Sequence, residues 1–557
     1  MRCYPSLKSL LEWSSLGIFL FLLFAAFMVS HGNDGGWTTV ELEEAKTVDN
    51  GDIETKVAPQ KSGSGVVWGT VQQTPPATPV PAATTVPSLA APKPVTANTA
   101  PALPSTTATT PTLPSATPAK TAPAVAAPAL TQPLPQPAVQ TPGKYLLKSG
   151  RRKGSTDLVE TLLEVSGEAK QIAADLKETR EKMEVVAGFR YEERTEQFTP
   201  TMLSSVRQYN LAKSKMKIGK DERMPELASE LQTIVCSVDR DNVSLFSPHG
   251  SLRGEQLLLI EDLPGNTLTI DRLLPNTEVA IGESWKIGDS VLRSFLSIDA
   301  VIASNVEAVL TAVADDMAMV DVIGDISGIY LGASTEMSVR AKFQFDLSSK
   351  RINWLGVIIE ENRTIGHVGP GLEHVAKLQV KISPLDTPQV LTDAAMMVIS
   401  TLPSSAVLQL KYDGGKGPWR FSHDRTWYVY QDDPQTTVLR KLVDGELVAQ
   451  CNVADMGTVD LQTMSTIEKF QQDLVAGLGN SFGKVAAAGE YTDRQGYKIY
   501  KVLLDGMVDD LALRWIYHLI TDKNGRQSVV VFVVEASMLD QFGNADDALL
   551  ETYRMGR

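Results

Sequence analysis

The chain has 557 residues, a formal net charge of −14 at pH 7 and three cysteines. The acidic balance argues against a nucleic-acid partner, because such a partner requires a basic face that displaces counterions from phosphates. No Cys-x-x-Cys pair is present, which excludes a zinc knuckle or thioredoxin-type chemistry.

Residues 1–32 have the features of an export signal. Arg2 and Lys8 precede an apolar run at residues 16–29, and Ser30-His31-Gly32 places small residues at a cleavage position. The run is shorter than the about 20 residues that a membrane-spanning helix needs. We therefore expect a cleaved signal peptide and an exported protein of the periplasm or cell envelope. An uncleaved N-terminal anchor is the alternative, and it would be the chain's attachment to a membrane.

Residues 33–144 are predicted to be a disordered linker. Residues 74–142 are a low-complexity run of Pro, Ala, Thr and Ser, in which Lys93 and Lys120 are the charged residues. Such a composition buries too little apolar surface to offset chain entropy, so an extended, stalk-like segment is expected. The basic cluster at residues 148–153 follows it. We interpret this cluster as a solvated boundary segment, with a tether to acidic polymer or lipid head groups as the alternative.

An antiparallel β-rich domain is predicted for residues 145–385. Apolar and charged residues alternate at 183–191, 339–347 and 376–382, which is typical of strands with one wet face. A helix is predicted to begin at Asp289, where apolar residues recur at helical spacing. Further strands are predicted at residues 233–238, 243–246, 267–270, 318–323 and 352–360. Residues 168–182 fit either a helix or a hairpin, and the flanking strands favour the hairpin.

Residues 386–404 are predicted to connect this domain to an α+β domain at residues 405–557. Ser465-Thr-Ile-Glu468 is a capping box, and Gly479 suits the end of the helix that it starts. Residues 527–534 are apolar on both faces, as expected of a central strand. Asn544 is expected to cap a last helix. Other strands are predicted at residues 406–412, 426–431, 436–442, 446–453, 483–491, 498–504 and 511–520.

Five sequence motifs carry a family resemblance. They lie at residues 274–285, 334–337, 366–371, 421–427 and 515–527. The motifs resemble those of exported proteins of unknown function from planctomycete-type bacteria, over nearly all of residues 155–557. This resemblance implies no activity, ligand or catalytic residue. The order of elements after Ser405 is also similar to the PsbP-like fold of the photosynthetic oxygen-evolving complex, which is a likeness of fold alone.

The strongest grouping of chemically active side chains surrounds a Gly/Pro loop. His367, Glu373 and His374 could gather a divalent metal or polarise a water molecule. A tight turn with locally bonded histidines explains the same residues, and we favour it because a third strong ligand is not evident. Cys236 and Cys451 alternate with apolar neighbours and are predicted core residues. We therefore assign no catalytic residue, metal or cofactor, and keep the three loop residues as candidates for a metal site.

Three functions are compatible with this sequence. The favoured one is a non-enzymatic binding or structural module on a flexible stalk, whose partner is an envelope protein or another cell-surface component. The first alternative is a lipid or small-hydrophobe carrier, because curved antiparallel sheets can enclose an apolar cavity. The second alternative is a metal-dependent hydrolase centred on His367 and His374.

Overall fold

The computed structural model describes residues 143–556, with gaps at 173–176, 240–241, 262 and 414. The predicted signal peptide or anchor lies outside the described residues. The predicted linker lies outside them too, except for its last two residues, of which Lys144 begins strand β1. The division into domains at residues 385 and 405 stays a prediction. Within the described part of the chain, no helix combines the length and the apolar character that crossing a membrane requires.

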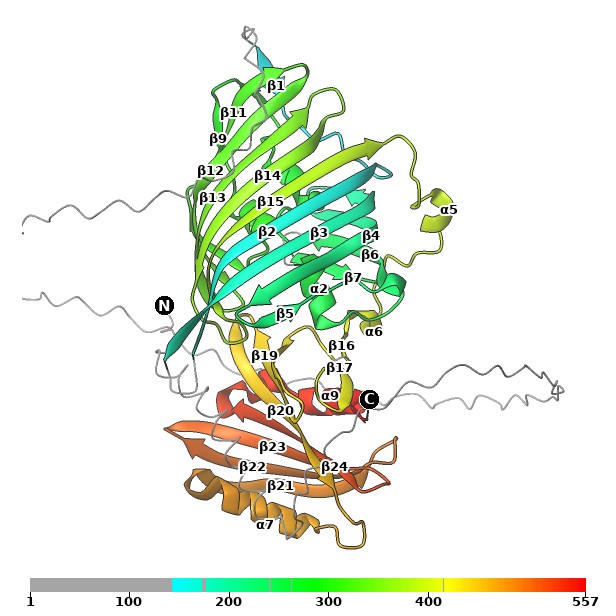
Figure 1. Cartoon of the computed structure of the whole chain (residues 1–557), viewed down its shortest axis with the longest axis vertical. Helices are drawn as coiled ribbons and strands as arrows, with labels where there is room; N and C mark the ends of the chain where they lie inside the picture. Colours follow the sequence, from blue (N-terminus) through cyan, green and yellow to red (C-terminus); the bar gives the residue numbers. More distant parts are fainter. Residues whose placement is uncertain (1–142, 173–176, 240–241, 262, 414, 557) are drawn as a thin grey trace, which may run out of the picture. The chain divides into compact units, whose positions relative to one another are not determined.

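The largest sheet is antiparallel and has 13 strands (Figure 1). Its strands follow the order β7-β6-β4-β3-β2-β15-β14-β13-β12-β11-β9, with β5 beside β4 and β10 beside β12. Their bounds are β2 (Thr156–Ile172), β3 (Glu178–Phe198), β4 (Met202–Ile218), β5 (Asp221–Arg223), β6 (Thr233–Asp239), β7 (Asn242–Phe246), β9 (Ser284–Lys286), β10 (Ala300–Ser304), β11 (Glu307–Ala314), β12 (Met317–Tyr330), β13 (Ala333–Asp346), β14 (Arg351–Arg363) and β15 (Gly371–Leu385). A separate pair joins β1 (Lys144–Leu146) to β8 (Glu278–Ala280). The mainly β, antiparallel prediction is confirmed.

Strict alternation along the long strands gives this sheet two different faces. In β13, Val339, Ala341 and Phe343 are buried, while Arg340 and Lys342 between them are exposed. Successive side chains of a strand point to opposite faces, so the apolar set lies on one face, here called the inner face. The charged set lies on the outer face. Strands β2 and β3 pair up to Ile172 and Glu178, so residues 168–172 and 178–182 are the two arms of a hairpin, as favoured.

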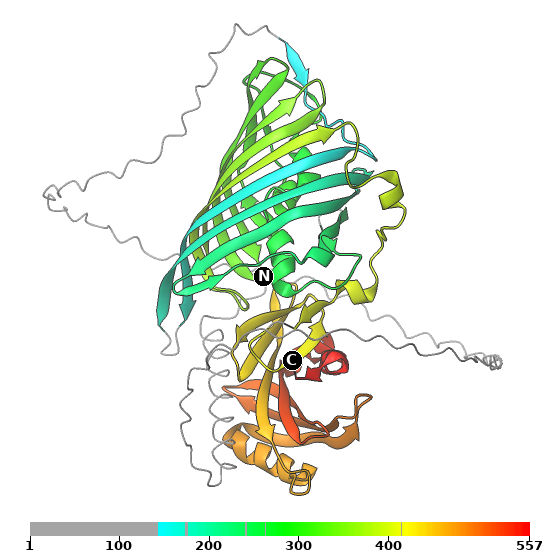
Figure 2. The same cartoon turned by 45° about the vertical axis from the view of Figure 1, so that its right-hand side comes forward.

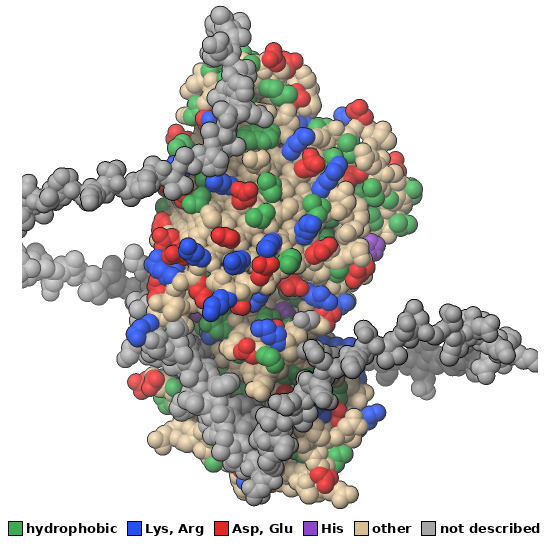
Figure 3. All heavy atoms as spheres, viewed as in Figure 1, with side chains coloured by type: hydrophobic (Ala, Val, Ile, Leu, Met, Phe, Trp, Pro, Cys, Tyr) green, Lys and Arg blue, Asp and Glu red, His purple; other side chains and the backbone are tan. Residues whose placement is uncertain are grey.

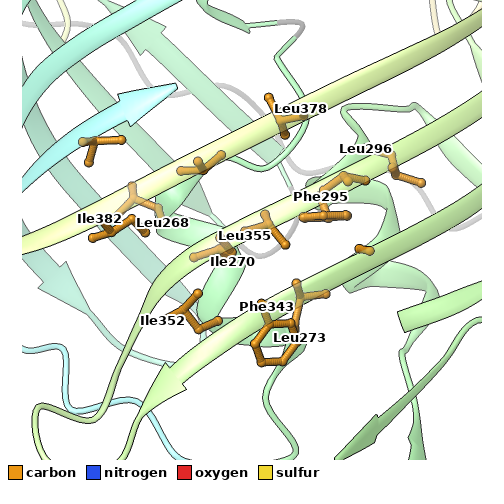
Figure 4. Close-up of a cluster of buried hydrophobic side chains, with 14 of the residues drawn as sticks. Leu268, Ile270, Leu273, Phe295, Leu296, Phe343, Ile352, Leu355, Leu378 and Ile382 are labelled. Carbon is orange, nitrogen blue, oxygen red and sulfur yellow. The ribbon is translucent and has the colours of Figure 1, made fainter. Parts of the chain in front are cut away.

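Short helices cover the inner face, and the sheet curls around them (Figure 2). They are α2 (Gly254–Glu261), α3 (Thr267–Ile270) and α4 (Asp289–Leu296), with the 3-10 turns η1 (Ser229–Leu231) and η2 (Asp271–Leu273). Leu268 and Phe295 from these helices pack with Phe343 and Leu355 from the strands (Figure 4), and all four are at most 3% exposed. Each such side chain contributes about 1.5–3 kcal/mol when fully buried. The buried Cys236 belongs to the same core, as predicted.

The predicted strand at residues 267–270 is wrong, because this segment forms α3. The side-chain oxygen of Asn266 accepts a hydrogen bond from the backbone N–H of Leu268 at 3.1 Å and caps the helix. All four residues of α3 are buried, so their β-branched composition reflects an apolar environment rather than a strand. The helix predicted at Asp289 is confirmed as α4.

The C-terminal part contains a second large sheet of seven strands, in the order β18-β19-β20-β24-β23-β22-β21. Its strands are β18 (Trp427–Asp432), β19 (Thr436–Val443), β20 (Glu446–Thr458), β21 (Phe482–Thr492), β22 (Lys498–Val508), β23 (Leu511–Thr521) and β24 (Arg526–Glu535), and beside it β16 (Leu410–Tyr412), β17 (Trp419–His423) and β25 (Arg554–Met555) form a three-stranded sheet. Strand β24 lies between β20 and β23, and its residues 529–534 are at most 3% exposed, which confirms the predicted central strand.

Helices lie on both faces of this sheet. Helix α7 (Ile467–Leu478) packs on one face through Phe470, whereas α8 (Leu539–Phe542) and α9 (Ala545–Thr552) pack on the other. The 3-10 turn η3 (Gly479–Ser481) follows α7, and the 3-10 turn η4 (Ala536–Met538) precedes α8. Cys451 is buried in the core on the second side, as predicted. The cap of α7 is Thr466, whose hydroxyl accepts from the Lys469 N–H, so the helix is capped one residue later than expected and Glu468 is not at the position that a capping box requires. Gly479 ends this helix at a φ of 51°, as expected.

The segment before the second sheet differs in part from the prediction. The strand expected at residues 406–412 is replaced by a helical turn, α6 (Ser405–Leu408), and the short strand β16. The connecting segment contains one helical turn, α5 (Asp393–Met396), in which the Thr392 hydroxyl accepts from the Ala395 N–H. A side-chain cap explains α5, since the Thr392 hydroxyl satisfies a free backbone N–H group, whereas Ser404 makes no such hydrogen bond at the start of α6.

Candidate functional site

The structure does not bring the three candidate metal ligands together. Glu373 lies on the outer face of β15, where its carboxylate is 3.0 Å from Arg180 and 3.6 Å from Lys170. His374 lies on the inner face of the same strand, and His367 is half-buried in the loop between β14 and β15. Among the described residues, no group of three or more His, Cys, Asp or Glu side chains is placed to hold a metal ion. Adjacent strand residues point to opposite faces, so the spacing of Glu373 and His374 separates them.

His374 instead belongs to a small polar cluster on the inner face. Its Nε2 is 3.5 Å from the Glu361 carboxylate. Glu361 also accepts hydrogen bonds of 2.7 Å from the Thr335 hydroxyl and the Arg363 Nε. Burial lowers the pKa of His374 despite the nearby carboxylate, so the imidazole is neutral near neutral pH. Its buried Nδ1 has no hydrogen-bond partner in the described part of the chain. This cluster ties β13, β14 and β15 together.

A larger ionic network lies at the other end of the inner face, where β14 begins. Three arginines and three carboxylates meet there, all with side chains at most 6% exposed: Arg151, Arg207, Arg351, Asp157, Glu193 and Asp271. Their formal charges cancel. Buried ions are tolerated only when they are paired and hydrogen-bonded, so this balance is what permits six charges in an apolar interior.

Glu193 is the best-satisfied member of the network. Its carboxylate accepts from Arg207 Nε at 2.8 Å, from the Ser205 hydroxyl at 2.9 Å and from Arg151 Nη1 at 3.3 Å. Burial alone would raise the pKa of Glu193, but the two guanidinium groups outweigh it and hold this pKa at about 2. The glutamate is therefore ionised throughout the physiological range.

Asp157 and Arg351 form a less satisfied end of the same network. They are paired with each other, yet Asp157 Oδ1 and Arg351 Nε have no hydrogen-bond partner among the described residues. Burial raises the pKa of Asp157 and lowers that of Arg351, because their ion pairs do not fully replace hydration. The network has a structural role, because its ion pairs join several elements. Arg151 precedes β2, Asp157 lies in β2, Glu193 in β3, Arg207 in β4, Arg351 in β14 and Asp271 in η2.

The expectation of a solvated basic segment at residues 148–153 is wrong for Arg151. Its side chain is 1% exposed, and its Nε donates to Asp271 at 3.0 Å. Arg152 and Lys153 are exposed, as expected. A signal for the network exists in the sequence, since Glu193 continues the face of Phe189 and Tyr191. A charge in phase with a buried strand face needs a buried partner.

The outer face carries a groove that crosses β12, β13, β14, β15 and β2. It has a volume of about 660 Å³. Its two walls are rows of mostly polar side chains, and its lining residues on the outer face are Ser166, Asp325, Glu336, Ser338, Glu360, Asn362, Glu373 and Val375. Met337, Glu361 and His374 lie between these rows in register, and their side chains point inward. Backbone atoms therefore form the floor of the groove.

Gly167 continues this floor into β2. A Cβ atom at Gly167 would lie 2.2 Å from the carbonyl oxygen of Glu373 and 2.5 Å from the Cα of His374. No larger residue fits such a close approach of two strands, so the glycine sets how closely β2 and β15 come together beneath the groove.

The groove carboxylates differ in their partners. Glu360 is paired with Arg340, and Glu373 with Arg180 and Lys170. Asp325 accepts a 2.9 Å hydrogen bond from the Ser338 hydroxyl, and Glu336 accepts one of 2.9 Å from the Ser327 hydroxyl. A serine hydroxyl orients a carboxylate without neutralising it. Acidic and basic side chains are interspersed on the face that Figure 3 shows. Within the groove, Asp325 and Glu336 differ from Glu360 and Glu373 because their partners are serines rather than cations.

A third buried polar group lies in the C-terminal sheet. His518 is fully buried, and its Nε2 is 3.2 Å from Asp546, which also pairs with Lys501 at 2.7 Å. Burial lowers the pKa of His518. Burial would raise the pKa of Asp546, but hydrogen bonds from His518 and Lys501 hold it at about 2. The group anchors α9 to β22 and β23.

No protein-family model matches the chain, and no curated protein matches it. Among solved structures, the cyanobacterial PsbP of Synechocystis sp. PCC 6803 is 14% identical over 28% of this chain and 98% of that chain, with a TM-score of 0.22. An outer membrane channel from Pseudomonas putida F1 is 8% identical over 70% of this chain and 97% of that chain, with a TM-score of 0.11. The translocator domain of autotransporter NalP from Neisseria meningitidis is 7% identical over 69% and 88%, with a TM-score of 0.10.

Part of the chain is thus structurally similar to a PsbP protein, which agrees in part with the resemblance seen in the sequence. The TM-scores of all three matches are low, and none of them carries an argument about function. The resemblance to exported proteins of planctomycete-type bacteria stays a prediction.

Proposed function

We propose that this chain is an exported, non-enzymatic binding protein of the cell envelope whose outer groove docks a cationic segment of an envelope protein. The observation that carries this proposal is the pair Asp325 and Glu336, two groove carboxylates held by serine hydroxyls. Carboxylates oriented in this way can accept charge-assisted hydrogen bonds from lysine or arginine side chains. Export and the absence of catalysis rest on the sequence features described above.

The inner face supports the carrier alternative less well. Helix residues such as Leu268 and Ile270 fill the space in front of Phe343 and Ile352, and these side chains are at most 1% exposed. A carrier must hold its ligand where these residues pack against each other. The hydrolase alternative is also weakly supported, because His374 and Glu373 lie on opposite faces of β15 and His367 lies in the adjacent loop.

The proposal is tested with an oligolysine peptide as the probe and the full-length chain as the receptor. We expect the peptide to bind, and a D325N/E336Q variant to bind about two- to thirtyfold more weakly, since exposed charge pairs contribute about 0.2–1 kcal/mol each. Binding should also weaken as salt is added. Isothermal titration calorimetry measures all three.

A matched variant separates groove binding from general attraction to an acidic protein. Glu164 and Glu184 are exposed on the outer face of β2 and β3 and do not line the groove. An E164Q/E184Q variant changes the net charge by the same amount and should bind oligolysine as the unmodified protein does. Equal losses in the two variants would overturn the proposal, and so would substrate turnover that depends on a groove residue.

A further inference from the structure

An apolar strip lies on the outer face beside the groove, along the middle of β14. It consists of Trp354, Gly356 and Ile358, which alternate with the buried Leu355 and Val357. Trp354 is half-buried, and Ile358 is 38% exposed. A Cβ atom at Gly356 would lie 2.6 Å from Cη2 of Trp354, so the indole ring lies along the strand in space that only glycine leaves free. The ring thus covers backbone with one side and leaves the other side to solvent.

Cationic and amide side chains flank the apolar strip on both neighbouring strands. Strand β14 pairs with β13 on one side and with β15 on the other (Figure 1), so each strip residue has an outer-face neighbour on each of them. These neighbours are Arg340, Lys342 and Gln344 on β13 and Lys377, Gln379 and Lys381 on β15. The strip is therefore bordered by four positive charges and two amides, and no acid is among the six.

Three of the four cations are available to a partner. Within the described part of the chain, Lys377 has no ion-pair partner. The side chains of Lys342 and Lys381 are 66% and 65% exposed, and each lies beside one acid of the next strand, at 3.1 and 3.8 Å. Exposed pairs of this kind contribute little to stability, so their exchange for another anion costs little. Arg340 is paired with Glu360 of the groove.

The two amides and the indole ring suit a sugar. The side chains of Gln344 and Gln379 make no hydrogen bond to any other residue that the structure describes. Each offers two N–H donors and a carbonyl acceptor, which can bind hydroxyl groups. An indole ring is a flat apolar surface on which the C–H face of a sugar ring can stack. Ring, amides and lysines therefore match the ring face, the hydroxyl groups and the carboxylate of an acidic sugar.

We propose that the apolar strip and its flanking side chains bind an acidic polysaccharide. A sugar ring stacks on Trp354, and carboxylates of the same chain pair with Lys377 and Lys381. Charge complementarity favours this occupant, because the strip is bordered by cations alone. A single-stranded nucleic acid also combines stacking with negative charge, but it carries a phosphate at every nucleotide, which the acidic groove beside the strip would repel. None of the six flanking residues lines the groove, so the two sites are separate.

Binding of an oligogalacturonate by the full-length chain tests the role of the lysines. We expect the unmodified protein to bind it in isothermal titration calorimetry, and a K377Q/K381Q variant to bind about two- to thirtyfold more weakly. Lys213 and Lys217 provide a matched control, because they are exposed on the outer face of β4 with the same spacing and do not flank the strip. A K213Q/K217Q variant should bind as the unmodified protein does. Absence of binding by the unmodified protein, or equal losses in the two variants, would overturn the proposal.

Substitutions of Trp354 separate stacking from charge. Leucine keeps an apolar cover but lacks the ring, so W354L should bind oligogalacturonate about two- to tenfold more weakly, whereas W354F should lose less. Urea unfolding checks that both variants are folded. An oligoglutamate peptide of equal charge has no sugar rings, so W354L should leave its weaker binding unchanged.

Three outcomes of this second experiment would contradict the proposal. A folded W354L variant that binds oligogalacturonate normally would exclude stacking on the indole ring. An equal loss for oligoglutamate would show that the substitution disturbs the surface rather than a sugar site. Tighter binding of a single-stranded oligothymidylate than of oligogalacturonate would assign the strip to nucleic acid instead.

Discussion

The inner and outer faces of the 13-stranded sheet hold their charged side chains in different environments. On the inner face, three guanidinium groups and three carboxylates are buried together and cancel. On the outer face, the groove holds Asp325 and Glu336 beside serine hydroxyls. The buried charges hold strands and η2 together, whereas the exposed acids remain available to a partner. Inner-face changes should therefore alter stability, and groove changes should alter binding.

The largest effect is expected when the inner network loses one charge. A Glu193→Gln substitution leaves Arg151 and Arg207 buried without their shared carboxylate, so the free energy of unfolding should fall by about 3–5 kcal/mol. Urea unfolding followed by circular dichroism measures this loss. Glu184→Gln, on the exposed side of the same strand, should change stability by less than about 0.5 kcal/mol. Equal effects of the two variants would contradict the distinction between the faces.

Packing alone should also give the two faces different contributions to stability, although this difference is smaller. Ile270 is fully buried on the inner side, whereas Ile358 is 38% exposed on the outer face of β14. Removal of one methyl group by Ile270→Val should cost about 1 kcal/mol, and Ile358→Val should cost much less. Thermal unfolding of both variants provides the comparison. A larger loss for Ile358→Val would mean that the outer face is covered in the native protein.

His374, on the inner face, should make the free energy of unfolding depend on pH, with an effect of similar or smaller size. Because burial lowers the pKa of His374 in the folded state, its contribution is complete above the unfolded pKa of about 6.5 and is lost as pH falls toward the folded value. Between pH 6.5 and 5.5 this loss is at most about 1 kcal/mol. A His374→Gln variant should therefore lose less stability over this interval than the unmodified protein. Identical pH profiles for the two proteins would show that His374 does not stay neutral.

Local sequence patterns predicted most of the strands but not the candidate site. Alternation located β3, β13 and β15, and the two-sided apolar run located β24. It failed at residues 267–270, where an Asn266 cap and complete burial favour a helix over the strand that the composition suggested. The cap of α7 lies at Thr466 rather than at the predicted Ser465, and the cap at Thr392 was not predicted.

The groove could not be predicted because its residues come from strands far apart in the chain. Asp325, Glu336, Glu360 and Glu373 meet through the registers of four strands, and sequence alone does not fix such registers. The ionic network could be predicted in part, since Glu193 continues an apolar strand face. Its arginine partners Arg151 and Arg207, however, come from other segments of the chain. The proximity of His367, Glu373 and His374 in sequence was misleading, because the first lies in a loop and the other two point to opposite faces of one strand.

Substitutions in the groove should have the smallest effect on stability and the clearest effect on binding. The D325N/E336Q variant should unfold within about 0.5 kcal/mol of the unmodified protein, since both residues are surface positions. The decisive measurement is oligolysine binding by this variant beside the E164Q/E184Q control, both checked for unchanged unfolding. The account predicts weaker binding for the groove variant alone. Unchanged binding by a correctly folded groove variant would contradict it.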